Sequence, residues 1–221
     1  LMRLHIKINA NKSIVSFDHI PQLVGTIHKW IGEQNDYHGS TSMYSFSWLQ
    51  GGRKGNGGLY FPKGASFFIS TFDEILLKQI IHGIREEPSL FAGMDVQEIR
   101  IQQTPCFSGG SECFNVASPV LVKVKEGERV KHCLYDDPES SEALTQSMVR
   151  KLELAGIDSV GLSIAFDQEY RSAHTKLINY KGVKNRANVC PVLVKGSNEQ
   201  IGFIWNVGIG HSTGIGFGAL N

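Results

Sequence analysis

The sequence predicts an α+β protein of two tandem ferredoxin-like domains, each with the RRM-like order βαββαβ, the second in a degraded form. Apolar residues in the first half change twice from alternating to helical spacing, and the same change begins again in the second half. The 221 residues suffice for two small domains, and 41% hydrophobic with 19% charged residues is a globular composition. We place the domains at residues 1–108 and 109–221.

The first half is expected to open with a strand and a helix. Residues 2–10 alternate polar and apolar side chains, which is typical of a half-buried strand. Ile20 to Ile31 then follow helical spacing after Asp18, a candidate N-cap. Beyond a glycine-rich basic turn at residues 51–58, a hairpin is expected around Lys63-Gly64. The strands expected in this part are Tyr44–Leu49, Leu59–Pro62 and Ser66–Ser70.

A second helix and a closing strand complete this unit. Thr71 and Glu74 have the spacing of a capping box, and apolar residues then recur at helical spacing up to Pro88. The segment from Val96 to Ile101 is typical of a strand. The resulting order of elements is the split βαβ pattern.

The second half repeats the start of this order. We expect one strand from Cys113 to Val124, a partner strand at Val130–Tyr135, and a helix that begins after Asp137-Pro138 and ends at Gly156. No second helix is expected in this half. The remaining segments are all typical of strands: Val160–Phe166, Lys176–Val183, Val189–Val194 and Ile201–Val207.

Composition restricts the kinds of site that the chain can carry. A formal net charge of +1 means that any nucleic-acid site is a local patch. The four cysteines have neither C-x-x-C pairs nor zinc spacing, so we expect reduced, mostly buried thiols and no bound metal. No segment has the apolar length of a membrane span, and we expect a cytoplasmic protein without a cofactor.

The most distinctive motif is a glycine-rich segment near the C-terminus, with five glycines in eleven residues. Glycine lets backbone N–H groups approach a bound group closely, which suits a phosphate-rich ligand. A tight hairpin or bulged turn remains the alternative. No helix follows the segment and no Gly-Lys-Ser/Thr is present, which disfavours a dinucleotide loop and excludes a Walker loop. The candidate RNA-binding residues here are Gly208, Gly210, His211, Gly214, Gly216 and Gly218.

A basic stretch in the second half is the next signal. Between Tyr170 and Asn198 there are six Lys or Arg residues and no acid. Asn residues and Tyr180 lie among them, which suits phosphate contacts together with stacking on RNA. An edge strand kept soluble by lysines is the alternative. The candidate RNA-binding residues are Lys176, Lys181, Lys184 and Arg186.

Two histidines are candidates for acid-base chemistry. His28 lies at the margin of the apolar stripe of the first helix, and His38 lies in the loop that follows. Imidazole can donate and accept a proton near neutral pH, so the pair can act as base and acid in RNA transesterification. The alternative for any single histidine is a structural role. Zinc binding by the pair is disfavoured, because no carboxylate or thiol lies beside them at helical spacing.

Together these segments resemble the CRISPR-associated repeat-RNA endoribonuclease family, the sixth numbered Cas family of the RAMP superfamily. The segment from Gly208 to Gly218 is similar to the family's loop G-x-G-x-x-x-x-G-F-G. Two further segments, Ala117–Val122 and His38–Gly51, are also similar to the family. The resemblance implies RNA held along a cleft and a basic face, and metal-independent attack by a 2′-hydroxyl that leaves a 2′,3′-cyclic phosphate and a 5′-hydroxyl.

The resemblance also implies site residues. The family's loop histidine matches His38, and the position of its helix tyrosine falls on His28. Residues 39–47 lack the family's lysine, and Ser42 occupies roughly its place. Charge stabilisation in the transition state is then left to Arg53, Lys54 or the second-half basic stretch. The expected catalytic set is His38, His28, Ser42, Tyr44 and Lys54, with Arg53 among the RNA-binding residues.

The expected partner is CRISPR repeat RNA. A RAMP subunit that holds RNA without cutting it is the first alternative, and the missing lysine favours it. An unrelated enzyme that binds a nucleotide in the glycine loop is the second. Association with other Cas proteins and homodimer formation are left open.

Overall fold

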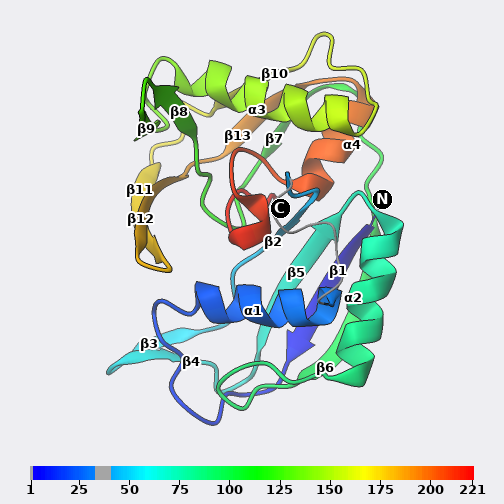
Figure 1. The fold of residues 1–221 in the computed structure, drawn as a ribbon, viewed down its shortest axis with the longest axis vertical. Coiled ribbons are helices and arrows are strands. Elements are labelled where there is room, and N and C mark those ends of the chain that lie inside the picture. The colour runs from blue at the N-terminus through cyan, green and yellow to red at the C-terminus, as the bar shows by residue number, and fades with distance from the viewer. Residues whose placement is uncertain (1, 33–40) are drawn as a thin grey trace.

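The computed structural model describes residues 2–32 and 41–221, and shows two sheet-and-helix units with the glycine-rich segment between them (Figure 1). The predicted catalytic residue His38 lies outside the described residues. In the part of the chain that the structure describes, no helix has the length and apolar character needed to cross a membrane.

The first unit is a ferredoxin-like fold. Its four-stranded antiparallel sheet has the order β2-β5-β1-β6. Helices α1 and α2 pack against each other and against the sheet, and their buried residues join those of β1 and β5 in one core. The elements are β1 (Met2–Ile8), α1 (Ile20–Ile31), β2 (Tyr44–Phe46), β5 (Ala65–Thr71), α2 (Glu74–Glu86) and β6 (Val96–Gln103).

The hairpin predicted around Lys63-Gly64 is wrong. The strand β4 (Gly58–Tyr60) pairs instead with β3 (Arg53–Gly55), inside the segment predicted as a turn. The strand after Gly64 is β5, which lies between β1 and β2. Its six buried residues of seven supply the centre of the sheet, so long-range burial decides its partners.

The second unit is a reduced copy of the first. Its sheet has the order β10-β13-β7, and where a fourth strand is expected the chain makes only an isolated bridge between Val116 and Leu220. This confirms a degraded second ferredoxin-like fold. The elements are β7 (Gly110–Phe114), α3 (Ser140–Leu154), β10 (Ser163–Phe166), β13 (Val192–Gly196), α4 (Asn198–Val207) and the short 3-10 helix η1 (Thr213–Ile215).

The strand predicted at Ile201–Val207 is wrong, because these residues belong to helix α4. Ser197 caps the helix in a capping box with Gln200. Eight of the ten helix residues are buried, so the apolar segment lacks the one-sided pattern of a surface helix. The second unit therefore has two helices, as the first does.

Two hairpins project from the second unit, and each overlaps a segment where a longer single strand was predicted. The predicted strand Cys113–Val124 is broken after Phe114, because residues 115–122 cross into the space between the units, where Val120, Leu121 and Val122 are buried. The predicted strand Lys176–Val183 turns back at Lys181-Gly182, both with positive φ, as a two-residue hairpin requires. The hairpin strands are β8 (Lys123–Glu126), β9 (Arg129–His132), β11 (His174–Tyr180) and β12 (Val183–Val189), so the predicted strand Val189–Val194 is divided between β12 and β13.

Three predicted helix caps are also corrected. His19, not Asp18, is the N-cap of α1. The side chain of Asp73 caps α2 by accepting from the N–H of Ile75, whereas Thr71 accepts from the N–H of Asp73. The helix α3 begins after Glu139, and Asp137 accepts from the N–H of Leu134. Thr71 and Asp137 thus accept from N–H groups that lie before the helices they were predicted to cap.

A buried arginine joins the two units. Arg3 on β1 is 3% exposed, and its Nη2 donates to the carbonyls of Trp205 at 3.2 Å and Leu220 at 2.7 Å. Its guanidinium also lies 3.8 Å from the ring centre of Phe68 and 3.5 Å from that of Trp205. Burial lowers the pKa of Arg3 to about 9, so it stays charged at neutral pH. Among the described residues no carboxylate pairs with it. Carbonyl oxygens and ring faces therefore replace a salt bridge.

We expect Arg3→Lys to lower the free energy of unfolding by about 2 kcal/mol, because lysine keeps the charge but loses the planar fork and ring stacking. Urea denaturation measures the change. Arg100→Lys is the matched control, since Arg100 pairs with Glu98 on the exposed side of β6 and its replacement should change stability by less than about 0.5 kcal/mol. Equal midpoints for the two variants would contradict the role of Arg3.

Candidate functional site

The glycine-rich segment is a packed connection between α4 and the C-terminal bridge. The N–H of Ile209 donates to Gly218, that of His211 to Leu121 and that of Gly218 to Pro119. A Cβ on Gly218 would lie 1.9 Å from the carbonyl oxygen of Ile209, and one on Gly214 would lie 2.3 Å from the Ser42 hydroxyl. The glycines therefore allow backbone to pack on backbone, and only part of the segment faces a ligand.

A pocket of about 470 Å³ lies where this segment meets both units. Gly210, His211 and Gly214 of the glycine-rich segment line it, whereas Gly208, Gly216 and Gly218 do not. None of the described lining residues is Asp or Glu. The groups with chemistry to offer are His28, Ser42, Tyr44, Arg150, Lys151 and His211.

The first wall of the pocket is a hydrogen-bonded chain from α1 to η1. Tyr44 donates its hydroxyl proton to the carbonyl of Gly214 at 3.1 Å, and His28 Nε2 lies 3.2 Å from the same hydroxyl oxygen. Because the tyrosine has one proton to give, His28 donates from Nε2, and in the neutral ring the basic nitrogen is Nδ1. Burial, followed by the effect of Tyr180, raises the pKa of Tyr44. Tyr44 therefore stays protonated and orients His28.

A second histidine that lines the pocket is in a different state. His211 Nδ1 accepts the N–H of Lys123 at 3.2 Å, so Nε2 bears the proton of the neutral ring. Burial lowers the pKa of His211, a backbone hydrogen bond with Leu121 opposes this, and the charges of Lys123, Lys151 and Arg150 lower the pKa further. At neutral pH this residue is a neutral N–H donor.

A buried lysine that the sequence analysis missed lies beside them. Lys151 on α3 is 4% exposed, and its Nζ donates to the hydroxyl of Thr213 at 3.0 Å. Burial lowers its pKa to about 7. A signal for it existed, because Lys151 shares helical spacing with the buried residues Leu144 and Met148, so a lysine occupies the apolar stripe of α3.

A groove continues from the pocket between α3 and the β8–β9 hairpin. It has a volume of about 480 Å³ and shares Ser147, Arg150 and His211 with the pocket. Lys123 and Lys125 line its far part, and no described lining residue is acidic. We name the pocket and this continuation the acid-free groove.

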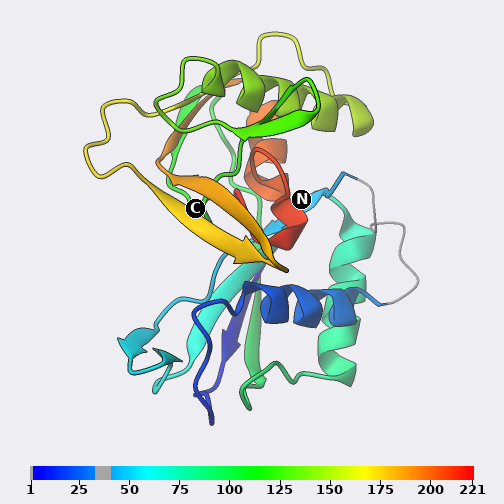
Figure 2. The same cartoon turned by 60° about the vertical axis from the view of Figure 1, so that its left-hand side comes forward.

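The predicted basic stretch forms the β11–β12 hairpin, which extends from the second unit toward α1 (Figure 2). Lys176 lies 4.9 Å from the ring centre of Trp48, whose indole N–H donates to Gly216 at 2.8 Å. Lys184 and Arg186 lie opposite Asn179 and Leu177, on the other face of the ribbon from Lys176. Lys181 occupies the turn. The four cations are exposed but do not form one surface.

The remaining predicted site residues lie in different places. Ser42 lines the pocket and its carbonyl accepts from Thr213 at 3.4 Å. Arg53 and Lys54 are exposed on β3 and are not among the residues that line the pocket. In Figure 1 the strand β3 lies on the other side of α1 from η1. The structure thus brings together His28, Ser42, Tyr44 and His211, but not Lys54.

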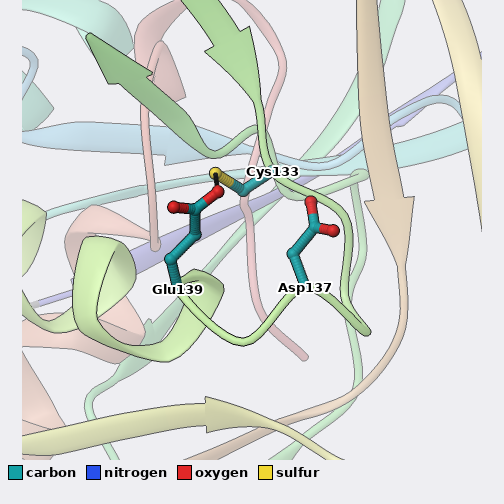
Figure 3. Close-up of side chains that lie close together, drawn as sticks. All are labelled: Cys133, Asp137 and Glu139. Atoms are coloured by element: carbon teal, nitrogen blue, oxygen red, sulfur yellow. Dashed lines mark hydrogen bonds between the residues drawn. The ribbon is translucent and has the colours of Figure 1, made fainter. Parts of the chain in front are cut away.

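One group of potential metal ligands occurs in the described part of the chain, at Cys133, Asp137 and Glu139 (Figure 3). Their ligand atoms lie within 4.8 Å of one another. Lys131 and the Cys133 thiol both donate to Glu139, and the N–H of Leu134 donates to Asp137. These contacts explain the cluster as a hydrogen-bonded start of α3. Cys106 and Cys113 are exposed, which corrects the expectation of mostly buried thiols.

Known structures share the whole fold. A protein described as Cas6-related from Pyrococcus furiosus has a TM-score of 0.85 and 21% identity, covering 100% of this chain and 97% of that one. A RAMP protein described as binding different RNA substrates has a TM-score of 0.84 and 20% identity, covering 100% and 99%. A product complex of a Cas6 protein from Thermus thermophilus has a TM-score of 0.70 and 11% identity, covering 99% of this chain and 98% of that one.

The sequence itself gives the family. No curated protein sequence matches the chain. Residues 101–221, more than half of its length, match the family described as CRISPR associated protein Cas6, C-terminal. This range includes α3, the β11–β12 hairpin and the whole glycine-rich segment. The chain therefore belongs to the Cas6 family of CRISPR-associated proteins.

Proposed function

We propose that the protein binds CRISPR repeat RNA and cuts it in the acid-free groove by attack of a 2′-hydroxyl on the adjacent phosphate. The observation that carries the proposal is a pocket between the two units that is lined by two histidines and, in the described chain, by no acidic residue. Such a pocket suits a polyanion and offers proton transfer at its phosphate. A 2′,3′-cyclic phosphate and a 5′-hydroxyl are the expected products, and no metal takes part.

His28 and His38 are the proposed acid and base, without an assignment of which is which. Tyr44 holds His28 so that its Nδ1 is the basic nitrogen in the neutral ring. His38 enters from the sequence alone. His211 contributes its Nε2–H as a neutral donor to a phosphate oxygen, since its Nδ1 is already occupied.

A subunit that holds RNA without cutting it is the second candidate. Its support is the fold shared with a RAMP protein described as binding different RNA substrates, and the absence of lysine from residues 39–47. The structure of a Cas6 product complex on the same fold supports cutting. Cleavage of repeat RNA by the purified protein distinguishes the two.

We expect His28→Ala and His38→Ala each to slow cleavage by about 10² to 10⁴-fold while RNA binding stays near the parental level, because each removes a proton-transfer group. Single-turnover cleavage of the repeat RNA in excess chelator, with affinity measured in parallel, gives both quantities. His82→Ala on the exposed side of α2 is the control. Parental cleavage by the His38 variant contradicts its assignment, and cleavage that stops in chelator contradicts the metal-independent reaction.

We expect the double variant Lys123→Ala/Lys125→Ala to lose more RNA affinity than Lys184→Ala/Arg186→Ala. The first pair lines the acid-free groove, whereas the second lies on the ribbon face opposite Lys176. Each lost contact to a single strand should lower the slope of log affinity against log salt by about 0.7. Filter binding across a salt series measures both slopes. A larger loss in the second variant would place the RNA on the hairpin.

A further inference from the structure

A lysine without a carboxylate partner is buried at the wall of the acid-free groove. Within the described residues Lys151 has one hydrogen bond, to the Thr213 hydroxyl, although an ammonium has three protons to donate. Among the described residues none of the ion pairs includes it. A buried and unpaired charge disfavours folding, and an apolar residue on this stripe of α3 would avoid that cost. The position therefore fits a ligand that brings the missing negative charge.

Thr213 fixes the place of this amine. Its hydroxyl accepts from Lys151 and donates to the carbonyl of Ser42, so α3 of the second unit is linked to the segment just before β2 of the first. Residues 39–47 contain no lysine of their own. The amine from the other unit is thus linked to Ser42 through Thr213, and it lines the same pocket as Tyr44 and His28.

We propose that Lys151 is the residue that binds the scissile phosphate and stabilises its charge during cleavage. The proposal deepens and rests on the proposed function. The bond from the 2′-oxygen to phosphorus forms as the bond from phosphorus to the 5′-oxygen breaks. A base takes the 2′-hydroxyl proton, an acid protonates the 5′-oxygen, and the ammonium of Lys151 faces the non-bridging oxygens, on which negative charge increases.

The neighbouring cations are less suited to this role. Arg150 is exposed at the rim of the pocket, and Lys54 is not among the residues that line it. A charge acts more strongly on a transition state when water is excluded, and Lys151 is the buried cation of the three.

The titratable and charged groups around Lys151 determine how it responds to pH. They are His28 from α1, Tyr44 from β2, Arg150 from α3, His211 from the glycine-rich segment and Lys123 from β8. None of them is an acid. In the free protein the amine is protonated below its pKa of about 7, and a bound phosphate raises that pKa. RNA binding at pH 7.5 should therefore be accompanied by proton uptake.

Lys151→Met tests the proposal, because methionine keeps the length and burial of the side chain and removes only the charge. We expect single-turnover cleavage of RNA from the CRISPR repeat of the same locus to fall by about 10² to 10³-fold. The melting temperature should be equal or higher, since a buried charge is lost. Lys78→Met, on the exposed face of α2, is the matched control and should cleave at the parental rate.

Lys151→Arg separates a charge from a structural contact. Arginine stays protonated at every accessible pH, so the alkaline decline of kcat/KM that Lys151 causes above about pH 7 should move to higher pH in this variant. A methionine variant that loses cleavage only together with a lower melting temperature, or one that cleaves at the parental rate, overturns the proposal.

Proton uptake keeps the two proposals distinguishable. If the wild-type protein does not cut the repeat RNA, the nuclease proposal fails and Lys151 is judged on binding alone. Calorimetric titration of the same RNA in buffers of different ionisation enthalpy counts the protons taken up. Lys151→Met should take up about three quarters of a proton less than the wild type at pH 7.5, because an amine with a pKa of about 7 is about one quarter protonated there before RNA binds. Equal uptake by the two proteins overturns the phosphate-binding role.

Discussion

The contact between Arg3 and the two ends of the C-terminal segment determines how the units meet. Its guanidinium donates to Trp205 before the glycines and to Leu220 after them, so β1 of the first unit holds both ends of the connection. With its ends fixed, the segment between them packs on residues 119–121 and on Ser42 and Tyr44. The pocket is formed where this connection, with η1 in its middle, packs between the two units.

The chemistry of the pocket depends on the hydrogen bonds that decide which ring nitrogen of each histidine carries the proton. On one wall Tyr44 donates a hydrogen bond to the carbonyl of Gly214, so His28 donates to the Tyr44 oxygen from Nε2. On the other, the N–H of Lys123 occupies Nδ1 of His211. Two identical side chains thus present different nitrogens, one basic and one a donor. Backbone groups of the second unit and one phenol of the first set this difference, and neither charge nor metal is needed for it.

Much of the fold was predictable from local pattern, and the failures have one physical origin. The helices α1, α2 and α3 show one-sided apolar spacing, so their positions follow from the sequence. The helix α4 is buried on all sides and resembles a strand in its apolar run, and β5 finds its partners only through distant residues. In the site, His28 and His211 were predictable as residue types. Lys151 could be found as a lysine within the apolar stripe of α3, but its place in the site could not be predicted, because its partner Thr213 is 62 residues away and the groove is formed by both units.

The acid-free groove is the place where a nearly neutral chain would hold the polyanion that we propose as its ligand. A net charge of +1 gives little long-range attraction for a polyanion, so the affinity for one depends on a local surface without acidic side chains. The described lining of the groove contains none, while Lys131 and Lys29 elsewhere are paired with glutamates. Cations that have no carboxylate partner can interact with a ligand that enters the groove. Burial strengthens this electrostatic interaction, and it also lowers the pKa of a buried amine. Lys151 shows both effects, because burial lowers its pKa and, among the described residues, no carboxylate pairs with it.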